Sequence, residues 1–148
     1  MNKETWKMIE QFYLKYRNAY ASPVKPELFD SLVQPYCANL DPDYREFVLR
    51  YGGGLVGSDA IYGLREAKMI GRPYGKATAP ELTQLFRDKN WPGVANWFIF
   101  TIPNGNPVGF EKDGTVWISD INFGQISQLA ENFEDYLLKW CLRVRKVE

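Results

Sequence analysis

The stretch LDPDYREFVLRYGGGLVGSDAIYGL, residues 40–64, decides the fold. Asp41 is a good helix N-cap, and Pro42 suits the first helical position because its fixed φ is helical and its missing N–H would have no partner there. We expect the helix to run over 42–51 and to end at the glycine run 52–54, since glycine adopts the left-handed cap conformation without a Cβ clash. The chain then restarts as a strand over 60–64. The stretch therefore predicts a helix, a glycine stop, a loop and a strand.

Apolar residues at three-and-four spacing predict two helices before this stretch. The first covers 3–20 and ends before Pro23, because the residue preceding a proline is pushed out of the helical region. The second is shorter, begins at Pro26 and ends or kinks near Val33, ahead of Pro35. The stripe of the first helix is formed by Trp6, Ile9, Tyr13, Tyr16 and Tyr20.

After the strand, glycine and proline interrupt the segment 65–77, which we interpret as a loop. Thr78 and Glu81 then have the spacing of a capping box, in which the threonine oxygen accepts a backbone N–H and the glutamate reaches back to the cap residue. This pattern predicts a fourth helix.

The second half of the chain is predicted to be mainly sheet. Residues 97–102 are apolar on both faces and rich in strand-forming types, which indicates a central strand buried on both sides. Strands over 108–112 and 115–119 flank Asp113-Gly114, a hairpin signal. A last helix is expected over 127–144, although a cap at Asn132 with Asp135 offers a later start.

The predicted element order is ααα, β, α, βββ, α. Strands gathered in the second half and helices mainly at the ends favour the α+β class, with an antiparallel sheet of about four to five strands packed against helices. We find no internal repeat or linker, so residues 1–148 are expected to form a single domain.

Composition excludes several functions. Eighteen basic residues balance eighteen acidic ones, so the chain has no net charge with which to attract polyanions or anionic membranes. Residues 142–146 form a local basic run within this balanced chain. Its simplest interpretation is a tail that keeps the terminus soluble. The start of the chain lacks the apolar run of a signal peptide and no segment is apolar enough to span a membrane, so we expect a cytoplasmic protein. We predict neither nucleic acid nor membrane as a partner.

Residues that carry chemistry are scarce. The chain has no histidine, which removes the usual general base and the commonest metal ligand. Cys37 and Cys141 are most simply two reduced thiols, with a disulfide as the alternative. The acidic residues Asp41, Asp43 and Glu46 could hold a cation, but acidic groups in a first helical turn also stabilise the helix dipole. We therefore expect no enzyme, no metal and no cofactor.

Four residues are candidates for contact with a partner protein, because their types anchor interfaces when exposed. They are Asp59 after the glycine loop, Arg72 and Tyr74 on the irregular loop, and Trp91 beside a Pro-Gly turn. The alternative is that Tyr74 and Trp91 simply cover the sheet. A third reading makes Asp59 or Tyr74 the base of a small-molecule hydrolase or transferase, which would require a polar cleft.

The chain resembles the SUKH superfamily of fungal Smi/Knr cell-wall regulators and bacterial toxin-immunity proteins. The resemblance covers about 26–138 and is carried mainly by three motifs: a helix with the Leu-Pro, Tyr and Phe pattern, a Tyr-Asn-Gly-Gly-like stop and a Tyr-Gly-Leu-like strand. In this sequence those motifs fall on Leu40, Pro42, Tyr44 or Phe47, Tyr51, Gly53, Gly54, Ile61, Tyr62, Gly63 and Leu64.

The resemblance implies a SUKH-like fold and a protein that neutralises a cognate toxin by direct binding. A regulatory or scaffolding adaptor of the Smi/Knr type is the alternative. The implied partner is a toxin or another protein, and the implied state is a monomer or a weak homodimer.

Overall fold

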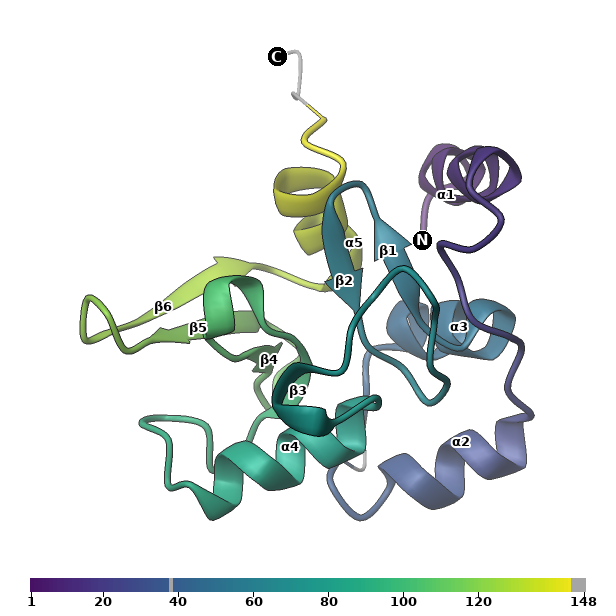
Figure 1. Ribbon diagram of the computed structural model, residues 1–148. Coiled ribbons are helices and arrows are strands. Elements are labelled where there is room, and N and C mark those ends of the chain that lie inside the picture. Colours follow the sequence, from purple (N-terminus) through teal and green to yellow (C-terminus); the bar gives the residue numbers. More distant parts are fainter. Residues whose placement is uncertain (38, 145–148) are drawn as a thin grey trace.

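The helix and glycine stop of the opening stretch are present as predicted. The computed structural model describes residues 1–37 and 39–144, and Figure 1 shows α3 (Pro42–Tyr51) near the middle of the helical half. Asp41 Oδ1 accepts from the N–H groups of Asp43 at 2.8 Å and Tyr44 at 3.4 Å. Gly52 ends the helix with a φ of 76°.

Two helices precede α3, and the first is shorter than predicted. The helix α1 (Lys3–Lys15) ends before Tyr16, whose φ of −122° is not helical. The chain leaves the helix there because Tyr20 pairs with Gly54 as an antiparallel bridge. The prediction of a helix to residue 20 is therefore wrong at its end. The second helix, α2 (Pro26–Val33), begins and ends where predicted.

A small two-stranded sheet follows the glycine run. It pairs β1 (Gly54–Val56) with β2 (Asp59–Ile61) in antiparallel fashion. The predicted strand over 60–64 is therefore displaced, and its partner β1 was not predicted because a glycine begins it. The strand ends at Ile61 because the next N–H, that of Tyr62, donates to Phe100 O at 2.8 Å in the main sheet.

The main sheet is antiparallel and has the order β3-β4-β5-β6. Its strands, together with the small sheet and the helices, confirm the α+β class. The prediction that residues 97–102 form a central strand is wrong, because β3 stands at one end of this order. All four of its residues are nevertheless buried. The strand bounds are β3 (Phe98–Thr101), β4 (Val108–Phe110), β5 (Val116–Asp120) and β6 (Gln125–Ala130).

The helix α4 (Ala79–Asp88) packs against β3. Its cap differs from the predicted capping box in one bond. Thr78 Oγ1 accepts from the Glu81 N–H at 3.4 Å, as expected, but the Glu81 carboxylate accepts from the Thr78 hydroxyl at 2.8 Å instead of from a backbone N–H. Two single 3₁₀ turns, Pro73–Gly75 and Pro103–Gly105, interrupt the connecting loops.

The C-terminal helix begins later than residue 127. Residues 125–130 form β6 because they pair along β5, a tertiary contact that overrides the helical spacing. The helix α5 (Phe133–Tyr136) starts after Asn132, whose Oδ1 accepts from the Asp135 N–H at 2.8 Å, so the alternative start is confirmed. A π-helical turn, Leu137–Cys141, continues it. Of the predicted basic run, Arg145 and Lys146 lie outside the described residues.

The core is centred on Tyr44, whose buried hydroxyl donates to Tyr62 O at 2.7 Å. Tyr44 packs against the main sheet, whereas Tyr51 at the end of the same helix does not. The Tyr51 ring packs against Tyr13 at 4.7 Å and Tyr20 at 5.5 Å, on the side of α1. The rings around Tyr44, with centroids 5.4 to 6.4 Å away, are those of Phe29, Phe98, Phe100, Phe110 and Phe133.

Candidate protein-binding surface

An apolar groove lies between α2 and α4. The α2 residues Phe29 and Val33 are buried, whereas Leu28 and Leu32 remain 38% and 43% exposed. Leu32 lines a hollow of about 550 Å³. The groove exists because α2 carries apolar residues over more of its circumference than the core covers. The other apolar residues that line it are Tyr36, Leu64, Pro80 and Leu85.

The rim of the groove is polar. Lys76, Glu81 and Asp88 lie along it, and the Tyr36 hydroxyl donates to Gln84 Oε1 at 3.3 Å across it. An apolar centre within a charged rim is the arrangement of a protein interface. It is also unlike a catalytic cleft, which needs titratable groups that converge on one point.

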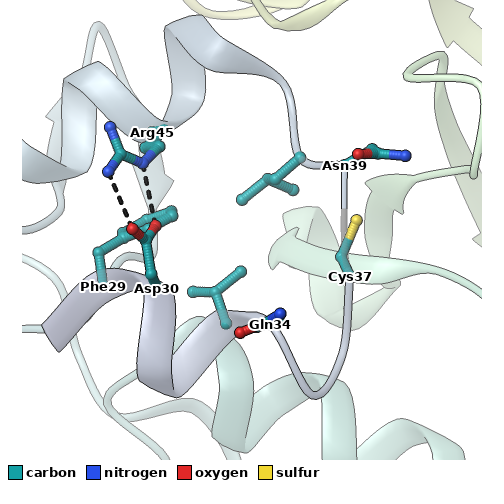
Figure 2. Close-up of a pocket in the computed structure, with 8 residues that line it drawn as sticks. Phe29, Asp30, Gln34, Cys37, Asn39 and Arg45 are labelled. Carbon is teal, nitrogen blue, oxygen red and sulfur yellow. Dashed lines mark hydrogen bonds and ion pairs between the residues drawn. The ribbon is translucent and has the colours of Figure 1, made fainter. Parts of the chain in front are cut away.

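A second hollow lies on the other side of α2, towards α3, and is more polar (Figure 2). Its volume is about 390 Å³. On one wall the Arg45 guanidinium donates to both carboxylate oxygens of Asp30, at 3.1 and 3.2 Å, and lies over the Phe29 ring. Cys37 and Asn39 lie on the opposite side, and burial raises the pKa of the Cys37 thiol, so the thiol is poorly nucleophilic. The helix α2 therefore stands between two hollows.

The structure brings Tyr74 and Trp91 together. Both rings pack edge-on against Phe86, at 5.5 and 5.1 Å. Tyr74 is 47% exposed, has a left-handed backbone with a φ of 55°, and donates from its hydroxyl to Gly105 O at 3.2 Å. Trp91 is half-buried and its Nε1 donates to Ser119 O at 3.2 Å. Trp91 thus covers part of the sheet, while Tyr74 is held in an exposed position.

Arg72 does not join them. Its guanidinium forms two hydrogen bonds with the exposed Glu66 carboxylate, at 2.8 and 2.5 Å. This pairing lowers the pKa of the Glu66 carboxyl. An exposed pair of this kind contributes little to stability.

Asp59 lies elsewhere, at the start of β2 and beside Cys141 of the C-terminal π-helical turn. Burial raises the pKa of its carboxyl, and the nearby Arg143 offsets this in part. Among the described residues, Asp59 Oδ2 has no hydrogen-bond partner although it is buried. Gly57 packs closely against the C-terminal π-helical turn, because a Cβ at this position would lie 2.1 Å from Cys141 O.

Sequence reasoning missed the groove. The helix 26–33 has four large apolar residues, Leu28, Phe29, Leu32 and Val33, and the core buries only Phe29 and Val33. This surplus of apolar residues on α2 is the sequence feature that could have indicated the groove. Leu85 carries no such indication, because a leucine next to Phe86 is equally typical of the core.

The described residues hold no group of three or more Cys, Asp or Glu side chains placed to bind a metal ion. Both cysteines are free. No helix in the described ranges has the length and apolarity needed to cross a membrane.

These elements define a small α+β protein in which helices cover an antiparallel sheet and leave an apolar groove between two of them. Residues 23–139 match the family model described as SMI1 / KNR4 family (SUKH-1), so the chain belongs to this family. The match leaves out α1. No curated protein matches the chain.

Proposed function

We propose that this chain is a non-enzymatic immunity protein of the cytoplasm that binds a cognate bacterial toxin and blocks its active site or its substrate path. Membership of the SUKH-1 family supports a protein-binding role. The observation that carries the proposal is the apolar groove between α2 and α4.

The groove suits a protein segment better than a small metabolite. Its exposed apolar residue Leu32 lies in reach of Leu85 and Pro80, which offers a site for an aliphatic or aromatic anchor. Glu81 and Asp88 on the rim outnumber Lys76, so we expect a basic residue on the partner beside the anchor. Inhibition by occlusion requires only one bound copy for each toxin molecule.

The loop that carries Tyr74 leads into this groove, since Lys76 is one of its rim residues. We propose Tyr74, Trp91 and Arg72 as a second contact region next to the groove. The exposed Tyr74 ring is held by Phe86 and by Lys89, whose Nζ lies 4.7 Å from the ring centroid. A ring ordered in advance loses little entropy on binding. We propose Asp59 as a peripheral contact only.

The test is co-expression with the product of any toxin-like gene that adjoins the gene for this chain, followed by co-purification and calorimetry. Leu32→Asp and Leu85→Asp should each weaken binding by about 2 kcal/mol or more, because each places a charge in the apolar centre of the interface. Leu14→Asp is the matched control. Leu14 is 64% exposed on α1, outside the residues that match the family.

Toxin binding at full strength by both groove variants would contradict the assignment of the groove. A protein that neither binds the toxin nor rescues growth would contradict the immunity function. Capture of several unrelated cellular proteins without the toxin would favour the alternative, a regulatory or scaffolding adaptor of the Smi/Knr type.

A further inference from the structure

A third hollow lies beside the groove, where the loop after α2 meets the end of α4. Its volume is about 300 Å³. Two cationic side chains line it, those of Arg87 in the last turn of α4 and Lys112 after β4. None of the described residues that line it carries a carboxylate. The other lining residues are Tyr36, Cys37, Asn39, Ala95 and Asn96. The hollow is therefore positively charged, in a chain whose overall charge is zero.

The Arg87 guanidinium is held in place by two neighbouring segments. Its Nη2 group donates to Tyr36 O at 3.3 Å and to Trp97 O at 2.9 Å. Its Cζ lies 5.5 Å from the centroid of the Tyr36 ring. These contacts fix the orientation of the guanidinium in advance, so a ligand does not have to order this side chain.

The charge of this guanidinium is not neutralised within the described part of the chain. Arg87 Nε is buried there without a hydrogen-bond partner, and Nη1 donates to none of the described residues. Arg45, Arg50 and Arg72, by contrast, each pair with a carboxylate. The two backbone carbonyls bonded to Arg87 carry only partial charges, so they leave its positive charge available to an anion.

Lys112 adds a second charge of the same sign. It is exposed and pairs with no carboxylate among the described residues. The carboxylates on either side of it in the sequence are already engaged. Glu111 accepts from Trp97 Nε1 at 2.8 Å, and Asp113 accepts from the Thr115 N–H at 3.0 Å. Two unpaired cations that line one hollow form a site for an oxyanion.

We propose that this hollow binds a carboxylate, supplied by an acidic side chain of the protein partner. Arginine presents its N–H donors in a plane that matches a carboxylate, and lysine adds a charge on a flexible stem. The amide of Asn96 offers a further donor at the same hollow. The inference rests on the proposed function for the source of the carboxylate, but not for the binding of a carboxylate as such.

The position of the hollow favours a protein segment as the source. Tyr36 lines both this hollow and the apolar groove, so the two are adjacent. The rim of the groove carries Glu81 and Asp88, whereas the hollow carries Arg87 and Lys112. A segment that crosses Tyr36 therefore meets an apolar centre with a mainly acidic rim and then a basic hollow. The partner that fits carries an apolar anchor with a basic residue on one side and an acidic residue on the other.

Titration with a blocked glutamate, acetyl-Glu-amide, tests the carboxylate site without any partner. In ¹H–¹⁵N NMR spectra at constant ionic strength, the Arg87 Nε–H resonance should shift in a saturable manner. The matched neutral probe, acetyl-Gln-amide, should leave it in place. Lys112→Glu should raise the dissociation constant of the glutamate probe about fivefold or more. Lys7→Glu, which makes the same charge change at an exposed position on α1, should leave it unchanged.

Three outcomes of this titration would overturn the inference. One is an equal shift with the glutamine probe. Another is the absence of any shift at glutamate concentrations up to about 100 mM, measured on a wild type that thermal unfolding shows to be folded. Inorganic phosphate that shifts the same resonance at a lower concentration than the glutamate would overturn the choice of a carboxylate as the ligand.

A second measurement separates this inference from the proposed function. In the complex with the toxin, folded Lys112→Glu should weaken binding about tenfold or more, and Lys7→Glu should not. Weak binding by Leu32→Asp together with full binding by Lys112→Glu would contradict the acidic contact and leave the proposed function standing. Glutamate binding by a chain that forms no toxin complex would contradict the proposed function and leave the carboxylate site standing.

Discussion

Asp41 Oδ2 accepts a hydrogen bond at 3.0 Å from the N–H of Phe133, a residue 92 positions further along the chain. The other oxygen of the same carboxylate caps α3, so one side chain holds the first turns of two helices. The sequence predicts the cap of α3 but not the bond to Phe133.

Asp41→Ala should lower the free energy of unfolding by about 2–3 kcal/mol, because two caps are lost together. Asp41→Asn keeps one acceptor oxygen and should lose about half as much. Urea denaturation measures both. Glu46→Ala is the control, since it breaks only the exposed pair with Arg50 and should cost less than about 0.5 kcal/mol. Equal losses for Asp41→Ala and Glu46→Ala would contradict the double cap.

Phe47→Ala should cost about 3–5 kcal/mol in the same measurement. The Phe47 side chain is fully buried and its ring lies 5.8 Å from that of Phe133. The shorter side chain would leave a cavity in the buried core. A loss below about 1 kcal/mol would mean that α3 does not occupy this place in the core.

Thr83→Val tests the hydrogen bonds between α4 and β3, in which the buried Thr83 hydroxyl accepts from the Ile99 N–H at 2.9 Å and donates to Ile99 O at 3.3 Å. Valine has the shape of threonine but cannot bond the Ile99 N–H and C=O, which would remain buried without partners. We expect a loss of about 1–3 kcal/mol in the free energy of unfolding. Ser31→Ala, which removes an exposed hydroxyl bonded to Leu28 O, should change stability by less than about 0.5 kcal/mol. A Thr83→Val variant as stable as the wild type would show that the hydroxyl is not needed at β3.

Asp59 gives stability a pH dependence of known sign. Burial raises the pKa of its carboxyl above the ordinary value of 3.8, so the folded chain binds this proton more tightly than the unfolded chain. The contribution of Asp59 to the free energy of unfolding is therefore present at acid pH, and it falls as the pH rises from about 3.8 through the raised pKa. The free energy of unfolding of Asp59→Asn, measured by urea denaturation and compared with that of the wild type, should therefore be higher at neutral pH than at acid pH.

Asp113 provides a control of opposite sign. Hydrogen bonds from the Thr115 hydroxyl and N–H lower the pKa of its carboxyl. Its contribution is present above the ordinary carboxyl pKa and is lost as the pH falls, so Asp113→Asn should be less stable than the wild type at neutral pH only. Two variants that respond to pH in the same direction would contradict the assignment for Asp59.

Local signals in the sequence located most helices correctly. Proline at a first helical position, a capping threonine and a left-handed glycine act within one turn, so α2, α3 and α4 could be predicted from their own residues. The error at residues 127–130 has the opposite origin. Their helical spacing is real, but pairing with β5 stabilises a strand there, and that pairing depends on residues elsewhere in the chain.

The candidate surface was harder to predict for the same reason. Tyr74 and Trp91 have interface-forming side chains, and the structure places both against Phe86. Asp59 and Arg72 have equally suitable side chains, yet the first lies beside the C-terminal turn and the second pairs with Glu66. The groove depends on how α2 and α4 pack, and neither helix alone indicates it.

The hydrogen bonds at the β3 edge protect this side of the main sheet against the addition of a strand. Thr83 and Tyr62 already occupy the backbone groups of Ile99 and Phe100 that an added strand would need. A strand from another molecule therefore finds no free hydrogen-bond partner at these two residues, which closes one of the usual routes to aggregation.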